Sequence, residues 1–254
     1  MFTELSEEPV LGRQKHLLII IGGKKGLKSL LGLVFTVICV LYMFLPMVFI
    51  GCPPVPAAIT TGILCAFVSL CVLNGLSFKS LSAILGTIAG VIAAGLMYTV
   101  IGFFANITIF NTQEAETLYL LAQNVPIKLN GILFAGIIIA SLGAVMDIGM
   151  SISSSVFEIH SVSRINSTKQ LFISGLSIGK DMMGTMTNTL VLAFAGSSLN
   201  TLILLYSYNM PFNQLMNSSI LGLEVLQAVS GTIGILAAVP VTAYISGWLC
   251  SKNR

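Results

Sequence analysis

The fold is decided by residues 146–198, which read MDIGMSISSSVFEIHSVSRINSTKQLFISGLSIGKDMMGTMTNTLVLAFAGSS. Two apolar segments flank a short polar passage, and they carry Asp147, Lys180 and Asp181 within long uncharged surroundings. A charged side chain at the centre of a bilayer costs about 2.5 to 3.5 kcal/mol on insertion scales, so such groups must face protein or water. The stretch therefore predicts packed membrane helices that keep polar faces away from lipid.

The whole chain has the composition of a membrane protein. Of its 254 residues 56% are hydrophobic and 8% charged, and the mean hydropathy is +0.97, whereas about 25% of the residues of a soluble domain are charged. A helix of about 20 apolar residues crosses the bilayer core. We predict an all-α, polytopic transmembrane helical bundle of about six spans, at residues 29–50, 57–73, 81–104, 131–151 with an extension to 158, 171–205 and 223–249.

The predicted organisation is one transmembrane domain at 29–249, preceded by a basic cytoplasmic segment at 1–28 and followed by a cytoplasmic tail at 250–254. Ten of the twelve Lys and Arg residues lie in tails and loops on one side, whereas only Lys128 lies on the other and Lys180 falls at or within the membrane boundary. This positive-inside pattern predicts that both termini are cytoplasmic. A Gly-Thr-Ile sequence at 86–88 and again at 231–233 is compatible with a weak 3+3 inverted repeat, as found in transporters.

Several function classes lack their sequence signals. The five cysteines form no CxxC pair and there are only two histidines, which predicts neither a metal site nor a disulfide framework. The net charge of +3 follows from loop placement, so the lipid bilayer and not nucleic acid is the expected partner. Since no GxxxxGK[ST], GxSxG or HExxH motif occurs, we expect no enzymatic activity and no cofactor.

Helical spacing sorts the polar residues of this region into two stripes. The first stripe has the spacing i, i+4, i+7 and i+11 and contains Asp147, Ser151, Ser154 and Glu158. The second stripe contains Asp181, Thr185, Asn188 and Thr189. We expect the two stripes to face each other. Glycines on both sides of Lys180 are also compatible with a break in the fifth span, because broken helices are tolerated where protein or water satisfies the backbone.

Three interpretations of the charged groups stay open. In the first, Asp147 and Asp181 line a path for a proton or small cation, and the hydroxyl and amide groups of the two stripes supply oxygen ligands. In the second, Lys180 pairs with Asp147 and the pair only fixes helix register. In the third, Lys180 and Asp181 lie at the cytoplasmic interface, where Lys180 extends toward water and Asp181 caps a helix.

The two motifs resemble the signature of the YibE/F-like bacterial membrane proteins. The resemblance rests on residues 144–154 with Glu158, on 174–190 and on 195–198, and it extends over nearly the whole hydrophobic chain. It implies a multi-pass protein of the bacterial cytoplasmic (inner) membrane, of the short YibF-type form, with a longer YibE-type sister protein as a heteromeric partner. Lys180 stands where the family motif is expected to have Arg, which keeps the charge but not the bidentate geometry.

The leading hypothesis from the sequence is a permease-like protein that moves a small solute or ion. Asp147 and Asp181 are its predicted binding or coupling groups, and the path comprises Asp147, Ser151, Ser154, Glu158, Lys180, Asp181, Thr185 and Asn188. The alternative is a non-transporting membrane subunit that scaffolds a YibE-type partner or envelope assembly. The sequence names no substrate and no oligomeric state.

Overall fold

The structure is a computed structural model that describes residue 23 and residues 26–105, 131–163, 167–199, 203, 206–207, 211, 213–214 and 219–252. Its long helices are Gly26–Phe49, α3 (Pro54–Asn74), α4 (Phe78–Ala105), α6 (Ile132–Ser163), α7 (Thr168–Ser197) and α10 (Ser219–Lys252). No strand occurs in these ranges. The predicted all-α fold is confirmed, whereas the connection predicted at 105–130 lies, from residue 106, outside the described residues.

Five of these helices are long and apolar enough to cross a membrane. They are Gly26–Phe49, Pro54–Asn74, Phe78–Met97, Ala135–Ser163 and Val225–Lys252. The sixth, α7, is 30 residues long and therefore of sufficient length, but it carries the polar residues of the second stripe. The predicted membrane-spanning helical bundle is thus confirmed, with α7 as its most polar member.

The first helix contains the π-helical turn η1 (Val40–Phe44), directly before α2 (Leu45–Phe49). The backbone N–H of Leu45 donates to the carbonyl of Val40, five residues earlier. Pro46 follows at the start of α2 and cannot donate such a bond. The wider turn accommodates this proline, so the first helix continues as one span to Phe49.

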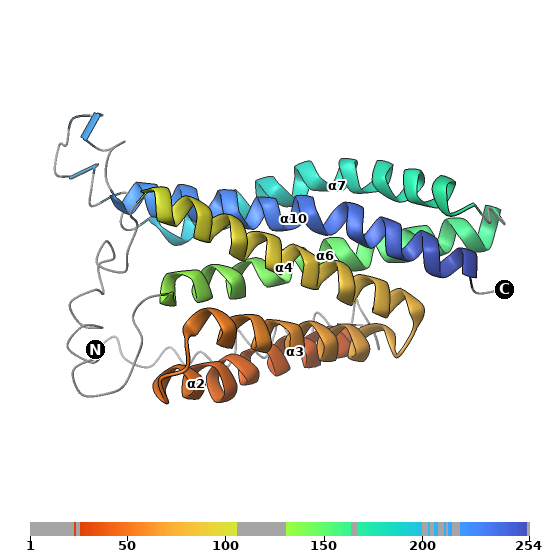
Figure 1. Ribbon diagram of the computed structural model, residues 1–254, viewed down its shortest axis with the longest axis horizontal. Helices are drawn as coiled ribbons and strands as arrows, with labels where there is room; N and C mark the ends of the chain where they lie inside the picture. The colour runs from red at the N-terminus through yellow and green to blue at the C-terminus, as the bar shows by residue number, and fades with distance from the viewer. Residues whose placement is uncertain are drawn as a thin grey trace.

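Helix α10 is the centre of the bundle, packed between α4 and α7 and also against α6 (Figure 1). Gly86 of α4 lies against Thr242, and Gly90 lies against Gly234. Because residue numbers rise along α4 while they fall along α10, these helices are antiparallel. In a bundle of six spans that alternate in direction, the third span (α4) and the sixth (α10) are antiparallel, as found here. This arrangement is also compatible with an inverted repeat.

Glycines allow α4 and α10 to approach each other backbone to backbone. A Cβ atom on Gly90 would lie 2.7 Å from the carbonyl oxygen of Gly234, and a Cβ atom on Gly234 would lie 3.0 Å from the carbonyl oxygen of Gly90. Small residues at such crossings let membrane helices gain van der Waals contact that lipid cannot replace. The close packing predicted from the glycines of the third span is therefore present.

Helix α7 is continuous from Thr168 to Ser197, so the break that the glycines suggested is not there. A Cβ atom on Gly175 would lie 2.7 Å from Val156 Cγ2 and 3.0 Å from Ala243 Cβ. Gly179 packs in the same way against Val239 and Ile152. These glycines let α7 pack directly on α6 and α10. They therefore serve close packing and do not interrupt the helix.

Four of the five Lys and Arg residues that the structure describes lie at one end of the bundle. The first helix begins there, α3 passes into α4, α6 passes into α7, and α10 ends (Figure 1). At this end Thr168 Oγ1 lies 2.7 Å from Ser251 Oγ, and Lys252 Nζ lies 4.9 Å from the centre of the Trp248 ring. We refer to it as the basic end, since Lys28, Lys79, Lys169 and Lys252 all lie there.

Candidate functional site

Asp147 lies near the middle of the long helix α6. The helix begins at Ile132 and ends at Ser163, so the chain continues for almost the same length on either side of the carboxylate. At about 1.5 Å per residue, each end is more than roughly 20 Å away. The carboxylate therefore lies near the middle of α6, far from both helix ends.

An open cavity of about 420 Å³ lies between the first helix, α3 and α6, and this side chain forms part of its lining. We refer to it as the Asp147 cavity. Its polar lining comes from the carboxylate of Asp147 and the hydroxyls of Ser29, Thr36 and Ser69. Thr36 Oγ1 donates to the carbonyl of Gly32 at 3.0 Å and lies 3.4 Å from Ser69 Oγ. Asp147 is exposed to this open cavity, whose lining combines the hydroxyls with apolar side chains such as Leu33 and Leu142.

Small residues keep this side of α6 open. Gly136, Ala140, Gly143 and Asp147 are exposed on one face of the helix, with the spacing that places them along a single line. A Cβ atom built on Gly143 or on Gly136 would meet nothing within 4 Å. The face therefore has room for a solute or for a partner, and Gly143 lines the cavity itself.

The remainder of the first stripe leads from the cavity toward the basic end. Ser151 and Ser154 are half-buried and Glu158 is exposed, so the four residues form the continuous polar face that the spacing predicts. By contrast, Ser153 is on the packed side of α6, where its hydroxyl donates to the carbonyl of Lys79 at 2.8 Å and lies 2.7 Å from Ser82 Oγ. Ser153 consequently ties α6 to α4 and is not part of the site.

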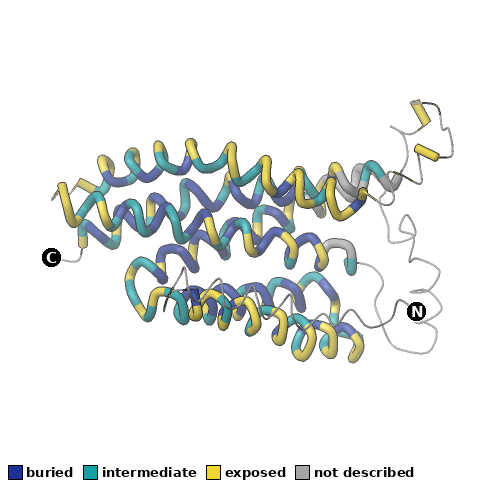
Figure 2. Tube along the Cα trace, turned by 180° about the vertical axis from the view of Figure 1, so that it is seen from behind, coloured by how far each residue is buried: buried dark blue, intermediate teal, exposed yellow. Residues whose placement is uncertain are grey.

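The polar residues of α7 point away from the bundle. Its buried residues are Leu171, Gly175, Gly179 and Leu190, whereas its outward residues Lys180, Asp181, Thr185, Asn188 and Thr189 are exposed. Asp181 follows Gly179 by two residues, which is about 200° around a helix. Figure 2 shows this exposed edge along α7. The expectation that the two stripes face each other is therefore wrong, because the glycine face of α7 does the packing.

Lys180 makes no ion pair with either carboxylate in the described part of the chain, and no residue of α7 lines the Asp147 cavity. The interpretation in which Lys180 neutralises Asp147 within one chain thus has no counterpart in the structure. Across the same described ranges, no three His, Cys, Asp or Glu side chains lie close enough together to hold a metal ion. The charged groups are therefore Asp147 in its cavity and the consecutive residues Lys180 and Asp181 on the outer face of α7.

Sequence reasoning missed the opposite wall of the Asp147 cavity. Ser29, Thr36 and Ser69 lie in the first two spans, where isolated hydroxyl residues in apolar helices have no distinctive spacing. Gly32 and Thr36 are one helical turn apart and could have been found as a small polar face. Which helix packs against that face depends on tertiary structure, so the link to Asp147 was not available from the sequence.

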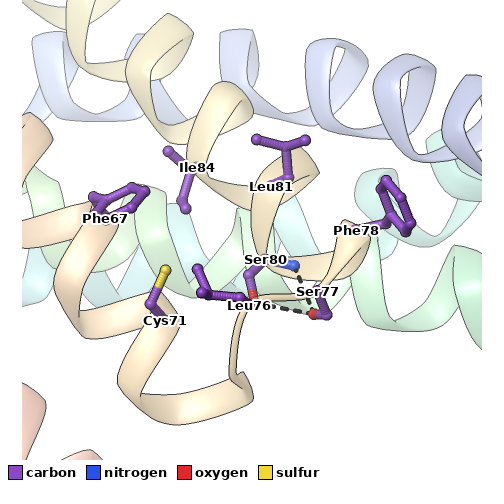
Figure 3. Close-up of a pocket in the computed structure, with 8 residues that line it drawn as sticks. All are labelled: Phe67, Cys71, Leu76, Ser77, Phe78, Ser80, Leu81 and Ile84. Atoms are coloured by element: carbon purple, nitrogen blue, oxygen red, sulfur yellow. Dashed lines mark hydrogen bonds between the residues drawn. The ribbon is translucent and has the colours of Figure 1, made fainter.

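A second pocket of about 270 Å³ lies where α3 turns into α4 (Figure 3). Phe67, Leu81 and Ile84 give it an apolar lining, with the thiol of Cys71. Its hydroxyl groups serve the turn itself, since Ser80 Oγ donates to the carbonyl of Gly75 at 2.7 Å. No carboxylate or ammonium group lines this pocket, which suits a hydrocarbon chain better than an ion.

The long apolar helices define a class: a multi-pass helical membrane protein. The model of the YibE/F-like protein family matches residues 15–252. The chain therefore belongs to the YibE/F-like family, and the resemblance seen in its two motifs is confirmed. No curated protein and no solved structure matches the chain.

Proposed function

We propose that this YibE/F-like protein is permease-like and moves a small solute or ion, with Asp147 as its binding or coupling group. The observation that supports the proposal is the Asp147 cavity, which is lined by a carboxylate near the middle of α6 together with the hydroxyls of Ser29, Thr36 and Ser69. Carboxylate and hydroxyl oxygens are suitable ligands for a proton or a small hard cation.

The direction of movement that we propose follows the first stripe. Ser151, Ser154 and Glu158 continue from Asp147 to the basic end along one face of α6. We place this end in the cytoplasm of a bacterial cell, because Lys and Arg are enriched in cytoplasmic loops. Asp181 was predicted to share the coupling role, but it lies on the outer face of α7, so the proposal gives that role to Asp147 first.

The test is flux into vesicles that contain the purified full chain. Protons are the first probe, followed with an internal pH-sensitive dye, and sodium and potassium are tested in parallel. We expect Asp147→Asn to abolish flux because the charge is lost while the shape is kept. Flux by Asp147→Asn equal to that of the parent, with normal membrane insertion, would contradict the proposal.

A matched pair of glycine variants tests the cavity separately from the charge. Gly143→Leu places a side chain in the Asp147 cavity, and nothing lies within 4 Å of its Cβ position. Gly136→Leu makes the same change on the same open face of α6 but outside the cavity lining. We expect Gly143→Leu to reduce flux strongly and Gly136→Leu to leave it near the parental rate.

The second candidate function is a non-transporting subunit that scaffolds a sister protein of the YibE type or envelope assembly. The exposed polar face of α7 supports it, because a neighbouring protein would shield such a face from lipid. Under this alternative Asp181→Asn should remove a complex from a native gel, whereas Asp147→Asn should leave the complex intact. No vesicle containing the parent chain should then show flux above that of protein-free vesicles.

A further inference from the structure

The outer face of α7 has a regular line of exposed polar and small residues. Its members alternate in steps of four and three residues, which is the spacing of the contact line between two packed helices. All are exposed. We define the α7 seam as Ser177, Asp181, Gly184, Asn188, Val191 and Ala195.

Lipid is a poor neighbour for this seam. Asp181 lies near the middle of α7, which begins at Thr168 and ends at Ser197. Helix α7 packs along α6 and α10, which are long and apolar enough to span a membrane. A carboxylate at the centre of a bilayer costs about 2.5 to 3.5 kcal/mol against lipid, and the exposed amide of Asn188 adds a second polar group. Polar side chains in this position are expected to face another protein surface.

The charges of the seam favour a second copy of this chain. Lys180 and Asp181 are consecutive and both are exposed, and neither has an ion pair within the described residues. A two-fold axis along the membrane normal makes the two α7 helices parallel and places equal residues at equal depth. Lys180, which precedes the seam position of Asp181, then flanks Asp181 of the other copy. Asp181 also meets its own counterpart at the axis, so each carboxylate depends on Lys180 of the other chain, and the four charges of the two ion pairs sum to zero.

The other seam residues suit a close, symmetric approach. Gly184 has open space around its Cβ position within its own chain, and Ser177 is small, so two backbones can come near each other. One turn beyond Gly184, Asn188 would meet its own counterpart, and paired Asn side chains in a helix contact bond to each other and fix its register. We propose that the α7 seam is the contact surface of a homodimer, in which Lys180 and Asp181 form reciprocal ion pairs across a two-fold axis.

Cysteine cross-linking in native membranes tests this contact with neighbouring residues as variant and control. Asn188→Cys lies in the seam, whereas Thr189→Cys is also exposed but points about 100° away around the helix. The parent chain with its own five free cysteines gives the background. Under mild oxidation we expect at least about fivefold more homodimer from Asn188→Cys than from Thr189→Cys, because only seam positions approach to disulfide distance.

Charge exchange tests the ion pairs in the full chain carrying two different affinity tags. Lys180→Asp alone and Asp181→Lys alone should each reduce co-purification of the two tagged copies about tenfold, which corresponds to about 1.4 kcal/mol. The double exchange Lys180→Asp with Asp181→Lys restores opposite charges across the axis and should recover most of the dimer. Since the double variant carries both substitutions, its recovery excludes a folding defect as the cause of the single losses.

The inference is overturned by equal cross-linking at residues 188 and 189, by failure of the double exchange to recover the dimer, or by cross-links only to a different polypeptide. This last outcome would assign the seam to a sister protein. Dimer formation does not depend on flux through the Asp147 cavity, so a chain that dimerises without transport would refute the proposed function and leave this inference standing.

Discussion

The crossing of α4 and α10 gives a quantitative prediction for Gly90→Ala. The added Cβ atom would lie 2.5 Å from Val145 Cγ1, 2.7 Å from the carbonyl oxygen of Gly234 and 3.0 Å from Ala238 Cβ. Optimal carbon contacts are about 3.5 to 4.0 Å. Two of these neighbours belong to α10 and one to α6, so relief of the overlap requires two helices to move away from α4.

The expected cost follows from overpacking. Extra carbon atoms in a well-packed core typically cost about 1 to 3 kcal/mol. Alanine also favours a helix by about 1 kcal/mol relative to glycine, which offsets part of that cost. Gly95→Ala is the matched control, because it lies in the same helix and its Cβ atom would be an ordinary 3.5 Å from Ile138 Cδ1. The helix preference is common to both variants, so Gly90→Ala should be less stable than Gly95→Ala by about 1 to 3 kcal/mol.

The assay is equilibrium unfolding in mixed micelles with increasing dodecyl sulfate, followed by the fluorescence of Trp248. This is the only tryptophan of the chain, and it belongs to α10, one of the two helices that must separate. The unfolding midpoint of Gly90→Ala should lie clearly below those of the parent and of Gly95→Ala. Equal midpoints for the two alanine variants would refute the close contact between α4 and α10.

Two further predictions concern helix contacts and orientation. Ser82→Ala and Ser153→Ala should each destabilise the protein by about 0.6 to 1.7 kcal/mol. The double variant should lose less stability than the sum of the two single losses, because Ser82 Oγ and Ser153 Oγ are 2.7 Å apart. Additive losses in the same unfolding assay would contradict this coupling. A reporter that fluoresces only in the cytoplasm should be active when it is fused after Arg254, because basic residues favour that side; a silent reporter on a stably inserted chain would reverse the proposed orientation.

Helical spacing correctly placed Asp147, Ser151, Ser154 and Glu158 on one face of α6, because that relation depends only on the geometry of a single helix. It could not establish where the face points. The cavity beside Asp147 is completed by Thr36 and Ser69, which are distant in sequence and carry no distinctive signal. The site was therefore predictable as a stripe and not as a cavity.

The second motif was interpreted correctly in its grouping and incorrectly in its direction. Asp181 and Asn188 do share one face of α7, but that face is exposed and lies opposite Gly179. A glycine in a membrane helix can permit a break or permit close packing, and only the neighbouring helix distinguishes the two. Here α10 lies against Gly175 and Gly179, which explains both the continuous helix and the outward direction of its charges.

The sequence by itself determined the membrane class, the approximate number of spans and the family. These properties follow from apolar run length and from motifs, which are local along the chain. Only the tertiary structure decided that Asp147 opens into a cavity while Lys180 and Asp181 lie on an outer face. The physical reason is that a helix fixes the angles between its own side chains, whereas its rotation in the bundle is fixed by the small residues through which it packs.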